Sequence, residues 1–207
     1  MFLSRIALDI SNRNTLEALS SPRKFHGALE SNFLGEKPRN LWRIDNLNGQ
    51  LYFLALTETA PDFSSFCKQF CKTRKASETK SYDNFLENIT NGSRWHFRLT
   101  ANPTWRTVSK IRNKHGKLYS CNTIAEQKNW LIKKSEQCGF QLNLSMFDIV
   151  QNKWYRFHKA DIAYISLLSV TYEGVLEVTD VELFRYALTH GIGKAKAYGM
   201  GLMTIMQ

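Results

Sequence analysis

Long apolar runs are missing from this sequence of 207 residues, and its N-terminal stretch, MFLSRIALDI, is interrupted by Arg5 and Asp9. A membrane-spanning helix needs about 18 consecutive apolar residues, and a secretory signal peptide needs an uninterrupted apolar centre. We therefore expect neither a membrane span nor a signal peptide, and we expect a cytoplasmic protein.

Cysteine is scarce, and the four cysteines, Cys67, Cys71, Cys121 and Cys138, are irregularly spaced. Three residues separate the close pair Cys67 and Cys71, whereas zinc ribbons and thioredoxin-like motifs have two residues at this point. The spacing instead places both thiols one turn apart on a helix, as buried apolar residues in a reducing compartment.

Clusters of metal-binding side chains are lacking as well. The residues His96, His115, His158 and His190 show no metal-ligand spacing, and no pair of carboxylates indicates a two-metal centre. A metal-dependent nuclease is therefore the least favoured class of enzyme for this chain, and we expect no cofactor.

Glycine is concentrated near the end of the chain, where residues 190–202, HGIGKAKAYGMGL, hold four of the eleven glycines. Glycine-rich loops bind phosphates when their N–H groups converge. However, Lys196 replaces the third glycine of a dinucleotide fingerprint, and Ala195 stands where a Walker loop has Ser or Thr. The loop therefore binds another polyanion or serves packing alone.

Acidic residues are absent from residues 93–117, which carry Arg94, Arg98, Arg106, Lys110, Arg112, Lys114 and Lys117. The whole chain has 28 Lys and Arg against 18 Asp and Glu, a formal charge of +10. Such a balance favours a nucleic acid or an acidic membrane face as partner. Because a solvated face usually mixes both signs, we predict an RNA-facing surface that includes Arg98, Arg106, Lys110 and Arg112.

A second basic stretch, residues 152–159, reads as a hairpin and contributes Lys153, Arg156 and Lys159. Trp105, Trp154 and Tyr155 lie within or beside the basic stretches. These aromatic side chains either stack on bases or, as is commoner at strand spacing, belong to a core.

The periodicity predicts the order βαββαβ twice. In the first half, strands are expected at residues 2–9, 40–44, 50–57 and, weakly, 81–89, with helices after Ser21-Pro22 and at 61–71. A serine cap and a proline in the first turn would start the first helix. In the second half, strands are expected at 94–99, 140–150, 163–178 and 202–206, with helices at 124–138 and 181–189. The fold class is therefore α+β, with two tandem ferredoxin-like domains at residues 1–90 and 91–207.

Seven stretches add a more specific signal through their order along the chain. They are MFLSRIALD, Ser21-Pro22 followed by His26, LWR at 41–43, FRLTANP at 97–103, AEQKNWL at 125–131, YEGVLEV at 172–178 and the glycine loop at 190–202. In this order they resemble the CasE family, the CRISPR repeat-processing endoribonucleases of the type I-E Cascade complex, within the RAMP group.

The resemblance implies a function. A CasE protein cuts the repeat RNA of a CRISPR transcript beside its stem-loop without a metal, and then stays bound to the product as a Cascade subunit. The partners implied are thus the CRISPR repeat RNA and other Cascade subunits. His26 would transfer protons while the 2′-hydroxyl attacks the adjacent phosphate, and Arg23, with Lys24 or Lys37, would stabilise the phosphate.

In the glycine loop, we expect Lys194 and Lys196 to reach the RNA backbone, with Gly193 and Gly199 providing N–H access or positive φ. Gly191 is expected to belong to the same RNA-binding loop. The chain departs from the family at two points. Arg23 replaces the tyrosine common three residues before the histidine, and Thr100 replaces the arginine that precedes Ala-Asn-Pro.

Two alternatives stay open at this point. His26 is either the proton-transfer residue or a half-buried helix histidine that is hydrogen-bonded to Glu30 one turn later. Accordingly, the protein is either a metal-independent endoribonuclease or an RNA-binding assembly subunit that performs no chemistry.

Overall fold

The computed structural model describes residues 1–31, 40–108, 116–159 and 162–207, with the backbone alone at 158, 159, 162 and 163. The first sheet contains β1 (Phe2–Ala7), β2 (Leu41–Leu47), β3 (Gln50–Thr57) and β4 (Ser77–Ser81) in the order β2-β3-β1-β4. Its helices are α1 (Arg13–Ser20), α2 (Arg23–Glu30) and α3 (Ser64–Phe70). All its strand pairs are antiparallel.

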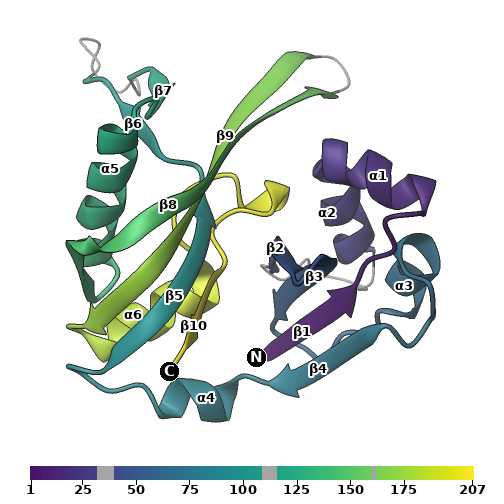
Figure 1. Ribbon diagram of the computed structural model, residues 1–207, viewed down its shortest axis with the longest axis horizontal. Coiled ribbons are helices and arrows are strands. Elements are labelled where there is room, and N and C mark those ends of the chain that lie inside the picture. Colours follow the sequence, from purple (N-terminus) through teal and green to yellow (C-terminus); the bar gives the residue numbers. More distant parts are fainter. Residues whose placement is uncertain (32–39, 109–115, 160–161) are drawn as a thin grey trace.

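The second sheet follows a short helix, α4 (Asp83–Glu87), and has the order β10-β5-β9-β8. Its strands are β5 (Arg94–Ala101), β8 (Phe140–Lys159), β9 (Ile162–Val178) and β10 (Met203–Met206), and its helices are α5 (Ile124–Gln137) and α6 (Val181–His190). A small hairpin of β6 (Thr104–Arg106) and β7 (Leu118–Ser120) is inserted before α5, and a 3₁₀ turn, η1 (Lys196–Tyr198), lies in the glycine loop. Counted within its own half, each sheet has the strand order 4-1-3-2, so the predicted tandem ferredoxin-like fold is confirmed (Figure 1).

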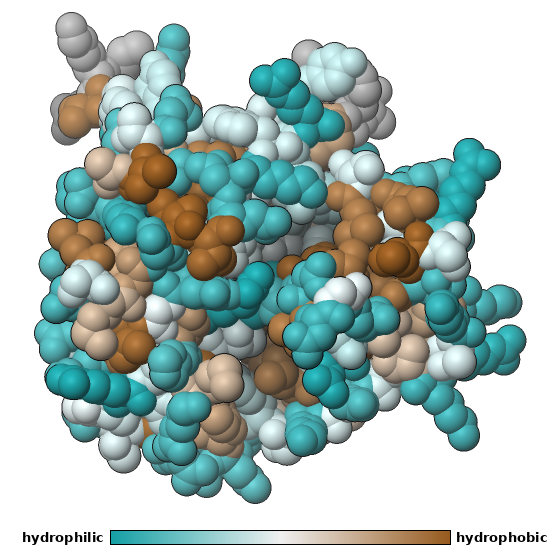
Figure 2. All heavy atoms as spheres, viewed as in Figure 1, coloured by the Kyte–Doolittle hydropathy of each residue, from teal (hydrophilic) through white to brown (hydrophobic). Residues whose placement is uncertain are grey.

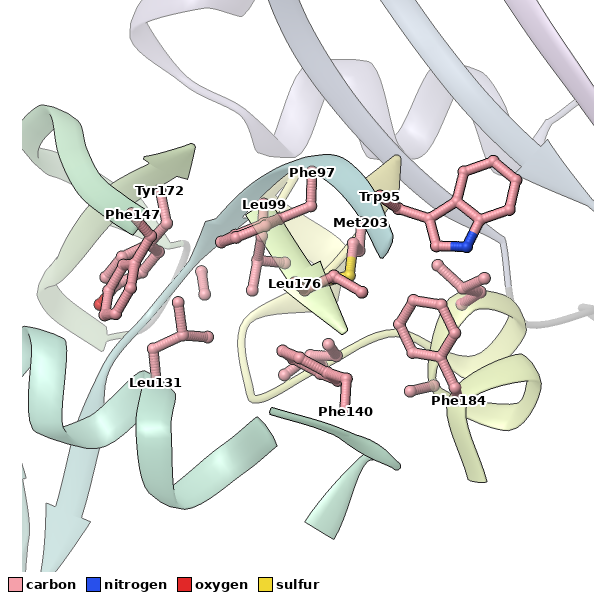
Figure 3. Packing of buried hydrophobic residues seen from close by; sticks show 14 of the residues in the cluster. Trp95, Phe97, Leu99, Leu131, Phe140, Phe147, Tyr172, Leu176, Phe184 and Met203 are labelled. Atoms are coloured by element: carbon pink, nitrogen blue, oxygen red, sulfur yellow. The ribbon is translucent and has the colours of Figure 1, made fainter. Parts of the chain in front are cut away.

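Each half has its own hydrophobic core. In the first, Phe25, Phe53, Phe66 and Phe70 form a chain of ring contacts, and Trp42 stacks on Phe53 at 5.2 Å between centroids. In the second, side chains from β5, β8, β9 and β10 pack against α5 and α6 (Figure 3). As predicted, Cys67 is a buried free thiol in α3 and Cys71 follows one turn later.

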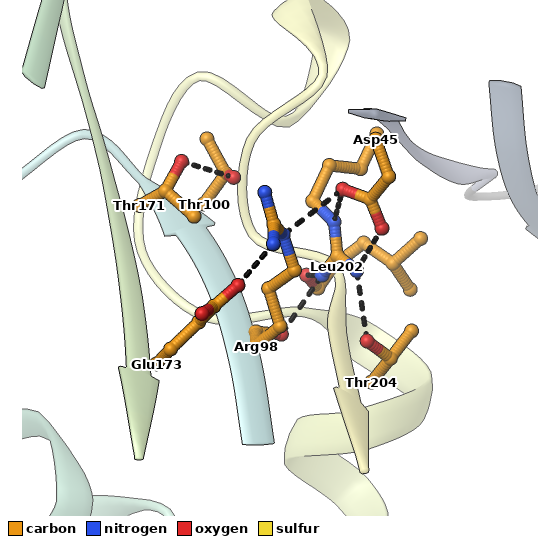
Figure 4. A network of polar contacts seen from close by, with 8 residues as sticks. Asp45, Arg98, Thr100, Thr171, Glu173, Leu202 and Thr204 are labelled. Atoms are coloured by element: carbon orange, nitrogen blue, oxygen red, sulfur yellow. Dashed lines mark hydrogen bonds and ion pairs between the residues drawn. The ribbon is translucent and has the colours of Figure 1, made fainter. Parts of the chain in front are cut away.

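The two halves are joined by hydrogen bonds from a buried arginine, Arg43, as well as by apolar contacts. Arg43 on β2 is 1% exposed, and its guanidinium donates two hydrogen bonds to Asp45, at 2.6 and 2.7 Å. It also donates to the carbonyls of Arg98 and Leu202 and to the hydroxyl of Thr204, all at 2.8 Å (Figure 4). All five N–H groups of Arg43 are thus used, and three of them cross to the second sheet.

Helix termini follow local sequence rules in the second half. Thr123 and Glu126 form a capping box at the start of α5, and the side chain of Asp180 accepts the N–H groups of Glu182 and Leu183 in the first turn of α6. None of the helices within the described residues is both long enough and apolar enough to cross a membrane.

Three expectations about elements are wrong. Residues 81–89 do not form a strand: β4 ends at Ser81, and α4 follows. The helix start after Ser21-Pro22 has no serine cap, because Pro22 is the N-cap residue and no side chain bonds the first turn of α2. The strand expected at residues 140–150 continues to Lys159, so the basic stretch belongs to β8.

Candidate RNA-binding and cleavage site

Helix α2 holds His26 at a fixed position. Phe25, Ala28 and Leu29 bury one face of this helix in the first core, while His26 is 25% exposed at its side. The imidazole Nε2 lies 3.1 Å from Oε1 of Glu30, one turn further along. A carboxylate partner orients the ring and selects the nitrogen that carries the proton.

Arg23 and Lys24 project from α2 into a cleft of about 650 Å³ that also contacts the end of α3. The ammonium group of Lys24 pairs with Glu17 of α1, and its hydrogen bond, followed by that of Arg13, holds the pKa of Glu17 below its usual range. Arg23 is exposed. His26 does not line this cleft, so the structure brings Arg23 and Lys24 together but not into one pocket with the histidine. Lys37 lies outside the described residues.

The glycine loop crosses from α6 to β10 and reaches the first half of the molecule. Its 3₁₀ turn, η1, contacts both α2 and β2. At Gly199 the backbone has φ +78°, and a β-carbon there would lie 2.6 Å from the ring of Trp42. Close approach of this loop to Trp42 on β2 therefore depends on glycine at this position.

The two lysines of the loop differ in their contacts. Lys194 is exposed, and its backbone forms an isolated bridge with Asn102. Lys196 donates a hydrogen bond of 2.6 Å to the carbonyl of His190, so its ammonium group also holds the loop together. Gly193 has positive φ, as expected, and Gly191 has positive φ as well.

A two-stranded arm, defined as residues 153–159 of β8 and 162–169 of β9, extends beyond the second sheet because β5 pairs with β9 only as far as Val170. In Figure 1 the arm reaches over α1 and α2, and in Figure 2 hydrophilic side chains cover much of its visible surface. A cleft of about 490 Å³ separates it from Leu19 and Ser20 at the end of α1.

The predicted arm residues line that cleft. Lys153 and Arg156 are both exposed, and the ammonium group of Lys153 lies 4.3 Å from the centre of the Tyr155 ring. Trp154 is 46% exposed and Trp105 is 48% exposed, so neither belongs to a core. The side chain of Lys159 lies outside the described residues.

The basic stretch at residues 93–117 is only partly available to a ligand. Arg94 pairs with Glu177, and Arg98 forms ion pairs with Asp45 and Glu173 (Figure 4). These carboxylates come from β2 and β9, so the local absence of acid did not reveal them. Arg106 is exposed, whereas Lys110 and Arg112 lie outside the described residues.

Sequence reasoning missed two aromatic residues that lie at these surfaces, Tyr198 and Tyr119. Tyr198 of η1 packs on Phe157 of the arm, with ring centres 5.2 Å apart, and so links the arm to the glycine loop. Tyr119 of β7 stacks on Trp105. Only strand pairing brings the members of the second pair together, since fourteen positions separate them in sequence. Within the described residues, no group of three His, Cys, Asp or Glu side chains has the arrangement of a metal site.

Comparison with known proteins identifies relatives over the whole chain. CRISPR-associated endoribonuclease Cse3 of Thermus thermophilus is 28% identical over 220 residues, which cover 99% of each chain. The structure of CRISPR endoribonuclease Cse3 bound to 19 nt RNA has 27% identity and a TM-score of 0.84, with 100% of both chains covered. Thermus thermophilus Cse3 bound to an RNA representing a pre-cleavage complex has 25% identity and a TM-score of 0.82, with 100% and 98% covered.

A family model described as CRISPR associated protein matches residues 1–207. The resemblance to the CasE family, inferred from the order of short motifs, is confirmed by these relatives. The protein therefore belongs to the CRISPR associated protein family.

Proposed function

We propose that the protein is a metal-independent endoribonuclease that binds the stem-loop of a CRISPR repeat and cuts the transcript beside it. The observation that carries this proposal is the placement of His26, which is oriented by Glu30 on a helix that contacts the glycine loop. The arm and its basic cleft overhang the same half of the molecule. The relatives named endoribonuclease match the full length of the chain and support this reading.

RNA supplies its own nucleophile for this reaction. The 2′-hydroxyl oxygen forms a bond to the adjacent phosphorus while the bond from phosphorus to the 5′ oxygen breaks, leaving a 2′,3′-cyclic phosphate and a 5′-hydroxyl. One proton leaves the 2′-hydroxyl and one reaches the departing 5′ oxygen. A histidine titrates near neutral pH, so His26 suits either transfer. The protein adds in-line positioning and cationic stabilisation of the phosphate, for which Arg23 is the exposed candidate beside His26 on α2.

The arm and the glycine loop bind different parts of the RNA. Lys153 and Arg156 contact phosphates of the stem, and Lys194 and the glycine N–H groups contact the RNA backbone that runs along the glycine loop. A-form RNA presents its base edges poorly, so shape and phosphate contacts dominate recognition of the stem. In line with the CasE resemblance, the product stays bound and the protein acts in the cytoplasm as a Cascade subunit.

The test is single-turnover cleavage of repeat RNA by wild type and His26→Ala in EDTA. We expect wild type to cut, and His26→Ala to bind equally well but to cut at least about 10²-fold more slowly. His96→Ala, which changes an exposed histidine on β5, is the matched control and should cut normally. A wild type that cuts only with Mg²⁺, or a His26→Ala variant that cuts at the normal rate, contradicts the mechanism.

A binding subunit without chemistry is the second candidate. The contacts of His26 with Glu30 and of Lys24 with Glu17 favour it, because each is also the contact of an ordinary helix surface. The same assay decides between the two, since this candidate requires tight binding of repeat RNA and no shorter product at any time.

A further inference from the structure

A second basic cleft lies between the glycine loop, the β6–β7 hairpin and α5, on the side of the loop away from α2. Its volume is about 440 Å³. Its lining includes Trp105, Arg106, Trp130, Lys134, Lys194 and Lys196. Among the described residues that line it, four are cations and none is a carboxylate.

Trp105 lines this cleft and belongs to a stacked aromatic pair, the aromatic platform. Trp105 of β6 and Tyr119 of β7 are directly paired across the hairpin, and their rings stack with centroids 5.1 Å apart and planes 24° apart. Trp105 is 48% exposed and Tyr119 is 44% exposed. An exposed stacked pair of this kind presents a ready surface for a planar ligand.

The cations around the platform keep their charge available. Arg106 donates to the carbonyl of Gly116, and Lys134 donates to the side-chain oxygen of Gln137. Both acceptors are neutral, and neither cation forms an ion pair within the described residues. Both side chains can therefore bind an anion in the cleft without first breaking an ion pair.

The floor of the cleft depends on a close approach of backbone to ring. Gly193 has φ +83°, and a β-carbon there would lie 3.1 Å from the ring of the buried Trp130. The glycine loop thus lies against Trp130 on this side, while its turn η1 contacts α2 on the other. One loop therefore connects this cleft to the helix that carries His26.

We propose that this cleft binds an unpaired nucleotide of the RNA strand that flanks the hairpin, with its base on Trp105 and its phosphate among Arg106, Lys134 and Lys194. Bases within a duplex are stacked on each other, so an isolated aromatic platform recognises an unpaired base. The assignment rests on the proposed function, because it takes the ligand to be the strand that flanks the repeat hairpin. A site for a protein partner would be expected to offer an apolar centre and mixed charge instead.

The test compares Trp105→Ala with wild type on hairpins made uncleavable by a 2′-deoxy nucleotide at the attacking position. The RNAs are the hairpin alone, the hairpin with its 5′ flank and the hairpin with its 3′ flank. We expect Trp105→Ala to lose roughly 5- to 100-fold in affinity for one flanked RNA and less than about 2-fold for the hairpin alone. Trp105→Phe should retain most of the affinity. Tyr186→Ala, which removes a 59% exposed ring on α6, is the matched control and should not discriminate among the RNAs.

Lys134→Ala gives an independent readout. Loss of one phosphate contact to a single strand should make the log–log salt dependence of binding shallower by about 0.7 for the flanked RNA and leave it unchanged for the hairpin alone. Equal loss on all three RNAs, or none, overturns the proposal. Failure of the proposed function is distinct: wild type would then not cut the cleavable RNA, whereas binding of a short unpaired oligonucleotide would still depend on Trp105 if the cleft is a nucleotide site.

Discussion

At the scale of single residues, the proposed chemistry rests on the contact between His26 and Glu30. Their side chains are each 25% exposed and 3.1 Å apart. The pair could be anticipated from the i, i+4 spacing. That spacing alone cannot separate a catalytic pair from a surface one, because both make the same contact.

Replacing Glu30 by glutamine tests whether the carboxylate positions and charges the histidine. Glutamine keeps an oxygen acceptor but removes the anion that stabilises an imidazolium, so we expect the pH–rate profile of cleavage to move to lower pH. The rate at neutral pH should fall severalfold while RNA affinity stays the same. Glu78→Gln, in an exposed ion pair with Arg5, is the control. A Glu30→Gln profile that overlays the wild-type profile would assign Glu30 to the surface.

Arg98 shows where reasoning from local sequence fails. Its neighbours in sequence include no acid, which predicted a side chain available to RNA. In the fold, Asp45 lies on a strand of the other half and Glu173 is its cross-strand partner on β9. The carboxylates that neutralise Arg98 are 53 and 75 positions away in sequence. They are brought to it by the strand topology, so the residues around Arg98 in sequence could not reveal them.

At the scale of elements, long and strongly periodic segments were predicted well. The helix at residues 124–138 and the strand at residues 50–57 agree with α5 and β3 to within a residue. The edge strand β4, SETKS, was not recognised, because it is polar, mostly exposed and paired with β1 alone within the described sheet. An edge strand has one neighbour and one packed face at most, so hydrophobic alternation is weak there.

The glycine loop provides a prediction at this scale. Gly199→Ala adds a β-carbon 2.6 Å from the Trp42 ring at φ +78°, whereas Gly92→Ala adds one at φ +77° with nothing within 4 Å. Both variants carry the backbone penalty of about 1 kcal/mol, and Gly199→Ala alone must also move η1 away from Trp42. We therefore expect a clearly larger drop in melting temperature for Gly199→Ala, together with slower cleavage.

Comparing the two variants separates the effect of the contact with Trp42 from the effect of backbone strain, because both glycines have nearly the same φ. Equal melting temperatures of Gly199→Ala and Gly92→Ala would mean that the loop does not rest on Trp42 in solution. If Gly199→Ala is destabilised but cleaves RNA at the normal rate, the position of the loop against Trp42 does not affect cleavage.

At the scale of the whole molecule, the two sheets are joined by a charged group that is almost completely buried. Asp45 has a side chain 5% exposed and is shared by Arg43 and Arg98. Removing one partner of a buried ion pair leaves the other charge buried and unpaired, which typically lowers stability by about 3–5 kcal/mol. Arg43→Met should therefore destabilise the protein strongly in denaturant unfolding, whereas Arg5→Met, in an ion pair 47% and 68% exposed, should change stability by less than about 1 kcal/mol. Similar small effects of both would show that the two halves do not depend on this junction.

The net charge of +10 gives the last prediction, because it separates general attraction from a specific surface. Each phosphate neutralised contributes about −0.7 to −0.9 to the log–log dependence of affinity on salt. Lys153→Ala with Arg156→Ala removes two exposed cations from the arm, so the slope for repeat RNA should become shallower by about 1.4 to 1.8. Lys75→Ala with Lys80→Ala removes the same charge from an exposed region beside and on β4. The second variant should leave the slope nearly unchanged, since charges that do not contact the RNA release no counterions from it. If both double variants shift the slope equally, the arm is not the stem-binding surface and the attraction belongs to the protein as a whole.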